Sequence, residues 1–177
     1  MTDVASAPDT RLWTPDGFRQ DDWVHAGEFA AAGTNGRVIL PLRAFLEIPA
    51  DERLRDRERI GVELAPGDQL EQIVGCLDQL ALVALSFPSF SDGRSFSKAE
   101  LLRSRFGYEG LVRATGQVLV DQLPHMLRLG FTEFEVSNPV LIERLEKGDT
   151  GGIPLYYQPT AKPAEAGQGY SWRRRKP

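Results

Sequence analysis

Short apolar runs alternate with segments of helical periodicity between about residues 61 and 146. The strand-like runs lie near residues 61–64, 80–86, 111–114 and 133–136. Such alternation is typical of parallel sheets whose strands are joined by crossover helices. The sequence therefore predicts an α/β fold with a mostly parallel sheet. Periodicity alone does not choose between an open sheet and a partial barrel.

The first two intervening segments carry clear helix signals. Asp68 is expected to cap a helix, because apolar residues follow it at i, i+3, i+4, i+7 and i+10. This apolar face consists of Leu70, Ile73, Val74, Leu77 and Leu80. Ser97 with Glu100 three residues later has the spacing of a capping box, so a second helix is expected to open at Ser97.

Two further helices are predicted in the last third of this region. One is expected to begin near Asp121, with Pro124 in its first turn and Gly130 just after its end. The other is expected to have Asn138 as its N-cap and Pro139 at its first position, where proline is favoured.

The amino-terminal part reads as short strands. A Pro-Asp-Gly turn between aromatic runs predicts a β-hairpin within residues 11–24. A strand is expected at residues 38–42, and Pro41 is expected to end it.

The chain divides into three parts by composition. Residues 1–10 are small and polar and are predicted to be disordered, and residues 11–150 are predicted to form a single α/β domain. Residues 151–177 are rich in Gly, Pro and Ala and are predicted to be an extended, partly disordered tail. The tail ends in a cationic run, Arg173, Arg174, Arg175 and Lys176.

Composition and motifs exclude several classes of function. The net charge of −4 does not suit a general polyanion binder, so no nucleic-acid partner is expected. The sequence contains no apolar stretch of the roughly 20 residues of a membrane helix and no apolar core of a secretory signal, so a cytoplasmic location without a membrane partner is expected. One cysteine, Cys76, cannot hold a four-thiolate cluster, and His25 and His125 lack metal-ligand spacing. No dinucleotide fingerprint or P-loop is present, so neither a cofactor nor a metal is expected.

Two loops that follow strands and precede helices are the candidate site, because ligands of parallel sheets bind at the carboxyl ends of strands. If the two strands are neighbours, Arg94 and Arg113 would stand on one rim and hold an oxyanion or a partner's carboxylate. The candidate residues for this anion or partner site are Asp92, Gly93, Arg94, Ser97, Arg113, Gly116, Asp121 and Gln122. A purely structural interpretation stays open, in which Asp92-Gly93 is a turn, Arg94 pairs with Asp92, and Asp121 caps a helix.

These loops also carry a family resemblance. The segment from residue 87 to residue 136 holds a recognisable pattern, carried by Phe87, Pro88, Phe90, Asp92, Gly93, Arg94, Ser97, Ala99, Leu101, Leu102, Arg103, Arg113, Ala114, Gly116, Asp121, Gln122, Leu123, Gly130 and Phe131. With this pattern the segment resembles the bacterial domain-of-unknown-function 934 family, whose members are commonly labelled as oxidoreductases involved in sulfite reduction. This chain departs from the pattern at Gln117, where the family usually has Asp. If that Asp is a catalytic acid in the family, this chain lacks it.

The resemblance implies a place in sulfur assimilation, but the chain lacks the means to reduce sulfite alone. That six-electron reaction uses siroheme with an iron–sulfur cluster, or a flavin. The first hypothesis is therefore an accessory protein that binds an oxyanion or docks on sulfite reductase or a related sulfur-assimilation protein. The alternative is a small α/β enzyme acting on a phosphorylated or sulfated metabolite, with Asp92 or Asp121 as acid or base. No catalytic residue is assigned.

Overall fold

The structure is a computed structural model that describes residues 10–33, 36–89 and 91–152. The predictions made for residues 1–9, for Phe90 and for the tail beyond Gly152, including its cationic end, lie outside the described residues.

Strands and helices alternate through the described chain, as the sequence predicts. The strands are β1 (Arg11–Thr14), β2 (Gly17–Arg19), β3 (Trp23–His25), β4 (Arg37–Pro41), β5 (Ile60–Leu64), β6 (Leu82–Phe87), β7 (Leu111–Gly116) and β8 (Glu133–Val136). The α-helices are α1 (Leu42–Glu47), α2 (Ala50–Arg55), α3 (Glu71–Val74), α4 (Arg94–Ser104), α5 (Leu123–Leu129) and α6 (Pro139–Glu146), and η1 (Phe29–Ala32) and η2 (Leu77–Gln79) are 3₁₀ turns.

All these strands belong to one sheet with the order β2-β1-β8-β7-β6-β5-β4-β3. Strands β3 to β8 are parallel, and each of β4 to β8 lies beside the strand that precedes it in the sequence. The predicted hairpin is present, because β2 pairs antiparallel with β1, and β1 pairs antiparallel with β8. The predicted mostly parallel sheet is thus confirmed, with the apolar strand β6 inside it.

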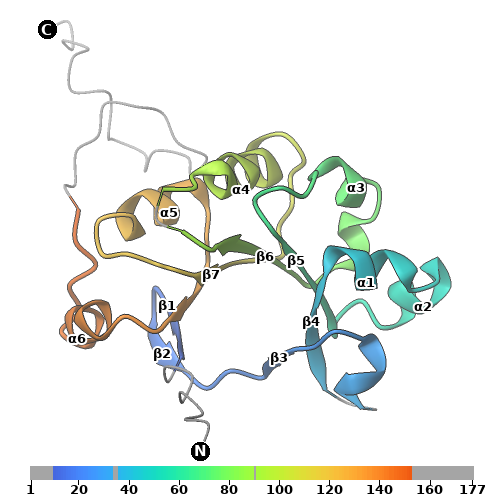
Figure 1. Ribbon diagram of the computed structural model, residues 1–177, viewed down its shortest axis with the longest axis horizontal. Coiled ribbons are helices and arrows are strands. Elements are labelled where there is room, and N and C mark those ends of the chain that lie inside the picture. Colours follow the sequence, from blue (N-terminus) through green and yellow to red (C-terminus); the bar gives the residue numbers. More distant parts are fainter. Residues whose placement is uncertain (1–9, 34–35, 90, 153–177) are drawn as a thin grey trace, which may run out of the picture.

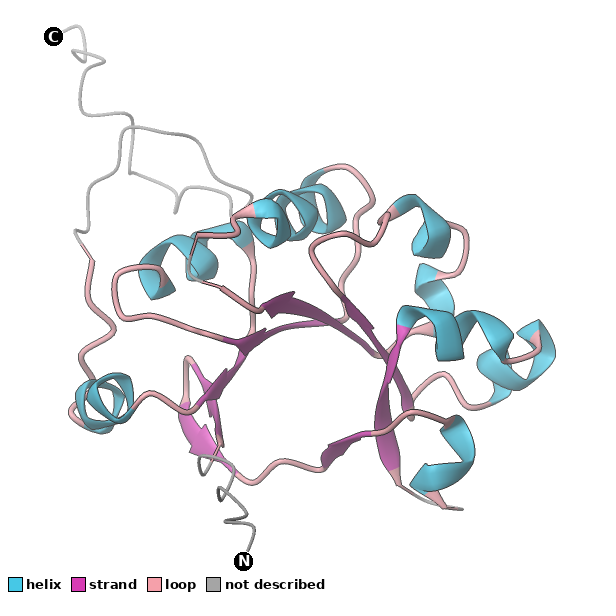
Figure 2. Cartoon of the chain, viewed as in Figure 1, coloured by secondary structure: helices cyan, strands magenta, loops and turns pink. Residues whose placement is uncertain are grey.

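The order of the strands explains where the helices lie. Successive parallel strands are always added on the same side, and crossovers of one hand then place every helix on the same face of the sheet. Figures 1 and 2 show α1 to α6 around the outside of a sheet that curls, with its other face concave. The fold is therefore a curled open sheet, wound like part of a barrel, without the reversal of strand order that creates a ligand crevice in doubly wound sheets.

Both faces of the central strand β6 are buried, as the continuous apolar run predicts. Val83 and Leu85 belong to the main core, which fills the space between sheet and helices. Leu82 and Ala84 point to the concave face, where they form a smaller apolar cluster with Trp23 and Ile39. The hairpin joins the main core through Trp13, whose ring centroid lies 5.4 Å from that of Phe134 on β8.

The predicted start of α4 at Ser97 is wrong. The helix begins at Arg94 with Gly93 at its N-cap position, and no side chain caps it. The reason is local: the Asp92 carboxylate accepts a hydrogen bond from the Arg94 amide, and Ser95 donates its hydroxyl to the Ser86 carbonyl of β6. These contacts turn the chain into the helix three residues before the predicted capping box.

The helix predicted after Asp68 is also shorter than expected. α3 ends at Val74 with Gly75 at its C-cap, and the apolar pattern continues into the 3₁₀ turn η2. Glycine is a poor helix residue, so it interrupts a segment that apolar spacing alone predicts to be continuous. Asp68 accepts a hydrogen bond from the Ala65 amide and closes the turn after β5 instead of capping α3.

The last two helices follow the sequence more closely. α5 begins at Leu123 with Pro124 in its first turn, and Gly130 adopts the left-handed conformation after its end, as predicted. The expected cap at Asp121 is wrong, because the N-cap position belongs to Gln122 and no side chain caps the helix. The predicted N-cap of α6 is confirmed, since Asn138 Oδ1 accepts hydrogen bonds from the first-turn amides.

Candidate functional site

The first predicted arginine, Arg94, lies on the surface at the start of α4 and is bound to a neighbour. Its Nε and Nη2 donate to the two carboxylate oxygens of Asp92, at 2.9 and 2.6 Å. The arginine side chain is 63% exposed. This hydrogen-bonded guanidinium lowers the pKa of Asp92 to about 2, so the pair is charged on both sides at neutral pH. The pairing of Arg94 with Asp92 agrees with the structural interpretation that the sequence left open.

The second predicted arginine, Arg113, lies in the middle of β7 and points into the concave side of the sheet. Its side chain is fully buried and binds three carboxylates. Nη1 and Nη2 donate to both oxygens of Asp21, at 2.8 and 3.0 Å. Nε donates to Glu133 at 2.9 Å, and Nη1 also donates to Glu135 at 3.1 Å. Burial lowers the pKa of Arg113, but the hydrogen bonds and charges of Asp21 and Glu133 raise it by more, so the group is a fixed cation.

Asp21 comes from the segment of residues 20–22, here called the crossing segment, which joins β2 to β3. These two strands are the opposite ends of the sheet, and Figure 2 shows the connection passing across the open side of the curl. The bond between Asp21 and Arg113 therefore ties the crossing segment to the middle of the sheet.

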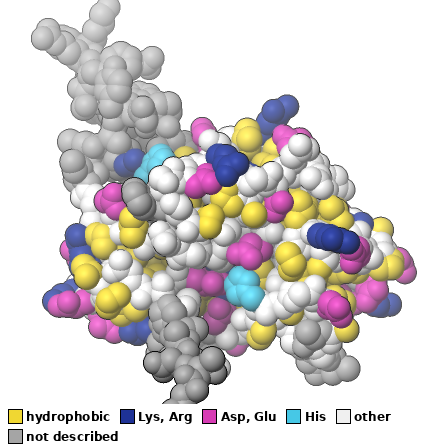
Figure 3. Space-filling model, in the orientation of Figure 1, with side chains coloured by type: hydrophobic (Ala, Val, Ile, Leu, Met, Phe, Trp, Pro, Cys, Tyr) yellow, Lys and Arg dark blue, Asp and Glu magenta, His cyan; other side chains and the backbone are white. Residues whose placement is uncertain are grey.

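The charged network continues to His25 at the end of β3. Its Nε2 lies 2.7 Å from Glu135 Oε1, and its Nδ1 lies 3.8 Å from Glu63 Oε2. Glu63 also accepts a 2.7 Å hydrogen bond from the Thr115 hydroxyl on β7. We call these seven residues, Asp21, His25, Glu63, Arg113, Thr115, Glu133 and Glu135, the concave network. Figure 3 shows acidic side chains beside a histidine near the middle of the view, over the area that the curled sheet encloses in Figure 1.

The structure gives the two predicted arginines different partners. Arg94 is paired with Asp92 on the helical side, whereas Arg113 is enclosed by acidic residues on the concave side. Arg113 is thus bound within the concave network. A second arginine for the predicted anion site would have to be a residue other than Arg113. Within the described residues, no group of His, Cys, Asp and Glu, this network included, has an arrangement that could hold a metal ion.

Gly116 has a clear backbone role next to this region. Its φ of +83° is a left-handed conformation, and a Cβ atom there would lie 2.5 Å from the carbonyl oxygen of Phe87. The close approach lets the Gln117 amide donate to that same carbonyl at 2.7 Å. Gly116 therefore lets the loop after β7 pack against the end of β6.

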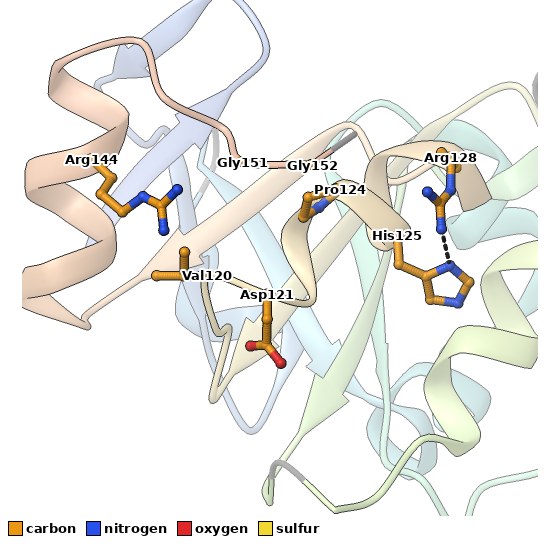
Figure 4. Close-up of a pocket in the computed structure, with 8 residues that line it drawn as sticks. All are labelled: Val120, Asp121, Pro124, His125, Arg128, Arg144, Gly151 and Gly152. Atoms are coloured by element: carbon orange, nitrogen blue, oxygen red, sulfur yellow. Dashed lines mark hydrogen bonds between the residues drawn. The ribbon is translucent and has the colours of Figure 1, made fainter. Parts of the chain in front are cut away.

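A pocket of about 460 Å³ lies on the helical side, between α5 and α6. Its lining, which defines the α5–α6 pocket, consists of Val120, Asp121, Pro124, His125, Arg128, Arg144, Gly151 and Gly152. Figure 4 shows Arg144 of α6 on one side and His125 with Arg128 of α5 on the other, with Pro124 between them. Three basic side chains from two helices thus line one hollow.

The basic side chains of this pocket contact neighbouring side chains. Arg144 Nη2 lies 2.7 Å from Asp149 Oδ2, and the two side chains are 40% and 51% exposed. Arg128 Nη2 lies 3.2 Å from Nδ1 of His125. Burial, and then the Arg128 charge, lower the pKa of His125, so its ring is neutral at pH 7. Arginine can only donate, so Nδ1 accepts this bond and the single proton of the neutral ring lies on Nε2.

Only Asp121, among the predicted site residues, lines this pocket. Gly93, Ser97 and Gln122 hold positions at or inside the starts of α4 and α5. His125, Arg128 and Arg144 were missed because surface charges on helices are normally solvated and give no distinguishing pattern.

The concave network was missed as well, although the sequence holds a signal for it. Arg113 stands between apolar neighbours in a buried strand. Glu133 on the adjacent β8 and Glu63 on β5, two strands away, are in register with it. A charge in such a place requires a partner. The partners could not be named, because the sequence does not show which strands face each other across the curl.

The fold, the pocket and the concave network define the class of protein. It is a curled, mostly parallel α/β protein with a pocket lined by basic residues on its helical face and a partly buried charge network on its concave face. Residues 61–167 match the model of a family described as bacterial protein of unknown function (DUF934). The match covers more than half of the chain, and the protein belongs to this family. A search of curated proteins finds no match. The matched range includes the α5–α6 pocket but begins after Asp21 and His25.

Proposed function

We propose that the protein is a cytoplasmic accessory protein of assimilatory sulfate and sulfite reduction. In this proposal it binds an oxyanion, or a carboxylate of a sulfite-reducing partner, in the α5–α6 pocket. The pathway comes from the resemblance described above, and the binding activity from one observation: Arg128, Arg144 and His125 line the same pocket. None of the helices in the described part of the chain is long and apolar enough to cross a membrane.

The pocket suits an anion better than the concave network does. Releasing Arg113 to a ligand would leave three carboxylates uncompensated beside a fully buried guanidinium, which is strongly unfavourable. The exposed pair of Arg144 and Asp149 contributes little to stability, so an incoming oxyanion can compete with Asp149 at small cost.

The donors of the pocket match the geometry of oxyanions. Guanidinium groups bind sulfate, phosphate or carboxylate oxygens through two parallel hydrogen bonds. The Nε2 proton of neutral His125 supplies a further donor. A volume of about 460 Å³ is in the range of small-molecule sites, so the oxyanion group can be free or carried on a larger molecule or a partner segment.

Calorimetric titration of the full chain with sulfite and with sulfate tests the proposal. Each charge-assisted hydrogen bond contributes about 1.5–3 kcal/mol, so Arg128→Ala and Arg144→Ala should each weaken binding about tenfold or more. Arg43→Ala is the matched control, because Arg43 is 92% exposed and paired with Glu47 on α1. Equal binding by the two pocket variants and the wild type would exclude the pocket as the site.

The same titration tests the strand-end loop predicted from the sequence, with Asp92, Gly93, Arg94 and Ser97. If Arg94→Ala removes binding and the pocket variants do not, the anion site lies in that loop.

A pull-down with sulfite reductase distinguishes a free oxyanion from a partner's carboxylate. Docking through a carboxylate predicts co-purification that Arg144→Ala reduces and that added sulfate competes away. Binding of free sulfite or sulfate predicts a calorimetric signal without co-purification. Failure of both assays would reject the proposed function.

A further inference from the structure

The concave network contains an ionisable group that takes no part in the α5–α6 pocket. His25 is the last residue of β3, which lies at one end of the sheet. Its two ring nitrogens face Glu135 of β8 and Glu63 of β5. Four strands separate β3 from β8 along the sheet, so this contact spans the curl instead of following the sheet.

Backbone pairing alone gives β3 little support. The strand has three residues, and within the described part of the chain its one neighbour in the sheet is β4, with which it pairs in parallel. Beyond the strand, the Ala26 amide donates to the Ile39 carbonyl at 3.1 Å. Strands this short depend on their side chains for position. Trp23 supplies apolar contact with the concave cluster, and His25 supplies the polar contact with the far strands.

The surroundings of His25 favour its protonated form. The groups that act on it are Glu135 from β8, Glu63 from β5 and Arg113 from β7. The hydrogen bond with Glu135 raises the pKa of His25, burial opposes this rise, and the charges of Glu135 and Glu63 add to it while Arg113 lowers it. The net direction is upward.

We propose that protonated His25 is a latch that holds the edge strand β3 against β5 and β8, and that loss of this proton loosens that edge. The charged ring attracts carboxylates on both sides. A neutral ring keeps one hydrogen bond to Glu135 but loses the attraction to both carboxylates. Glu63 and Glu135 keep Thr115 and Arg113 as partners, so the rest of the sheet stays closed.

The direction of the pH effect follows from the raised pKa. The contribution of the latch is complete below the pKa of about 6.5 that histidine has in an unfolded chain. It is lost as the pH rises through the higher pKa of the folded protein. The latch therefore opens on the alkaline side. The opening is local, because Asp21 remains bound to Arg113, whose charge does not change in this range.

Hydrogen exchange of the full chain between pH 5.5 and 9 tests the latch, with amide protection corrected for the intrinsic effect of pH. The His25 side chain is 42% exposed, so the effect should have the size of a partly screened ion pair. Protection of residues 23–26 should fall about twofold to fivefold across the titration of His25. Protection of β6 should stay unchanged.

Two matched variants separate this latch from the other histidine. His25→Gln should remove the pH dependence at residues 23–26, whereas His125→Gln should retain the wild-type profile. The NMR titration of the His25 ring, assigned with the same variants, should have the same midpoint as the loss of protection. Glu135→Gln keeps the hydrogen-bond acceptor and should lower that midpoint.

Two outcomes would overturn the inference. One is a wild-type profile that is flat while the ring titrates, and the other is an unchanged decline in His25→Gln. If His25→Gln does not fold, the midpoint in Glu135→Gln decides, because an unshifted midpoint would show that Glu135 does not govern the proton.

Discussion

The guanidinium group of Arg113 binds both carboxylate oxygens of Asp21, at 2.8 and 3.0 Å, although 92 positions separate the two residues in the sequence. Asp21 lies in the crossing segment, between strands that stand at opposite ends of the sheet. This contact fixes the connection across the open side of the curl. It also explains why a permanently charged side chain stands in the middle of a buried strand.

Removing that side chain should destabilise the protein severely. Arg113→Ala would leave Asp21, Glu133 and Glu135 without their common cation, and loss of one partner from a buried ionic group costs about 3–5 kcal/mol. Chemical denaturation, followed by circular dichroism, measures the change. Arg94→Ala is the control, because its guanidinium is exposed and its removal should leave the denaturation midpoint nearly unchanged. Equal midpoints for Arg113→Ala and wild type would show that the network contributes nothing to folding.

Two glycines with left-handed backbones should respond differently to alanine. Gly116 has a φ of +83° and no room for a Cβ, whereas Gly107 has a φ of +61° and nothing within 4 Å of the added atom. Gly107→Ala should therefore cost only the left-handed conformation, about 1–2 kcal/mol. Gly116→Ala should cost more than that, since the Phe87 carbonyl has to move. Thermal melts of the two variants compare them directly, and equal losses would contradict the close approach.

Oxyanion binding should strengthen as the pH falls through the titration of His125. Burial and the Arg128 charge lower the pKa of this ring, so it is neutral at pH 7 and gains a charge only in more acidic solution. An anion in the α5–α6 pocket favours that charge. Sulfate is the suitable probe, because sulfite itself takes up a proton near neutral pH. Titrations from pH 5 to 8 should show tighter sulfate binding at the acidic end, and His125→Gln should abolish the trend. A trend that persists in this variant would assign it to another group.

The sequence predicts the strands of this fold well because buried parallel strands are continuous apolar runs. The run that forms β6 and the proline and glycine positions around α5 are local signals, and they hold in the structure. The prediction of where α4 starts was wrong because the turn at Asp92 and the hydrogen bond from Ser95 to β6 compete with the capping box. That competition depends on where β6 ends, which is tertiary information.

The site was less predictable than the fold for the same reason. Arg94 and Arg113 both precede helices in the sequence, but the alternation of side chains along β7 turns Arg113 to the concave face. Its partner Asp21 belongs to a segment whose path depends on the curl of the whole sheet. The α5–α6 pocket likewise has Arg144 and Arg128 on opposite sides of one hollow, an arrangement of two helices that no local pattern records.

The last prediction concerns Lys98, a lysine on the buried side of α4. Lys98 is only 8% exposed, and its ammonium group donates hydrogen bonds to the carbonyls of Ala65 and Pro66, in the turn after β5. Burial lowers the pKa of this amine, and the bonds to the two carbonyls hold α4 against the end of the neighbouring strand. Lys98→Met keeps the length of the side chain but leaves both carbonyls without their charged donor, which should cost about 1.5–3 kcal/mol. Lys147→Met is the matched control, because Lys147 is 69% exposed and pairs with Glu143 one turn away on α6, where the effect should stay below about 0.5 kcal/mol. Urea denaturation of the two variants compares them. Equal stability would mean that the turn after β5 finds other donors and that Lys98 does not hold it.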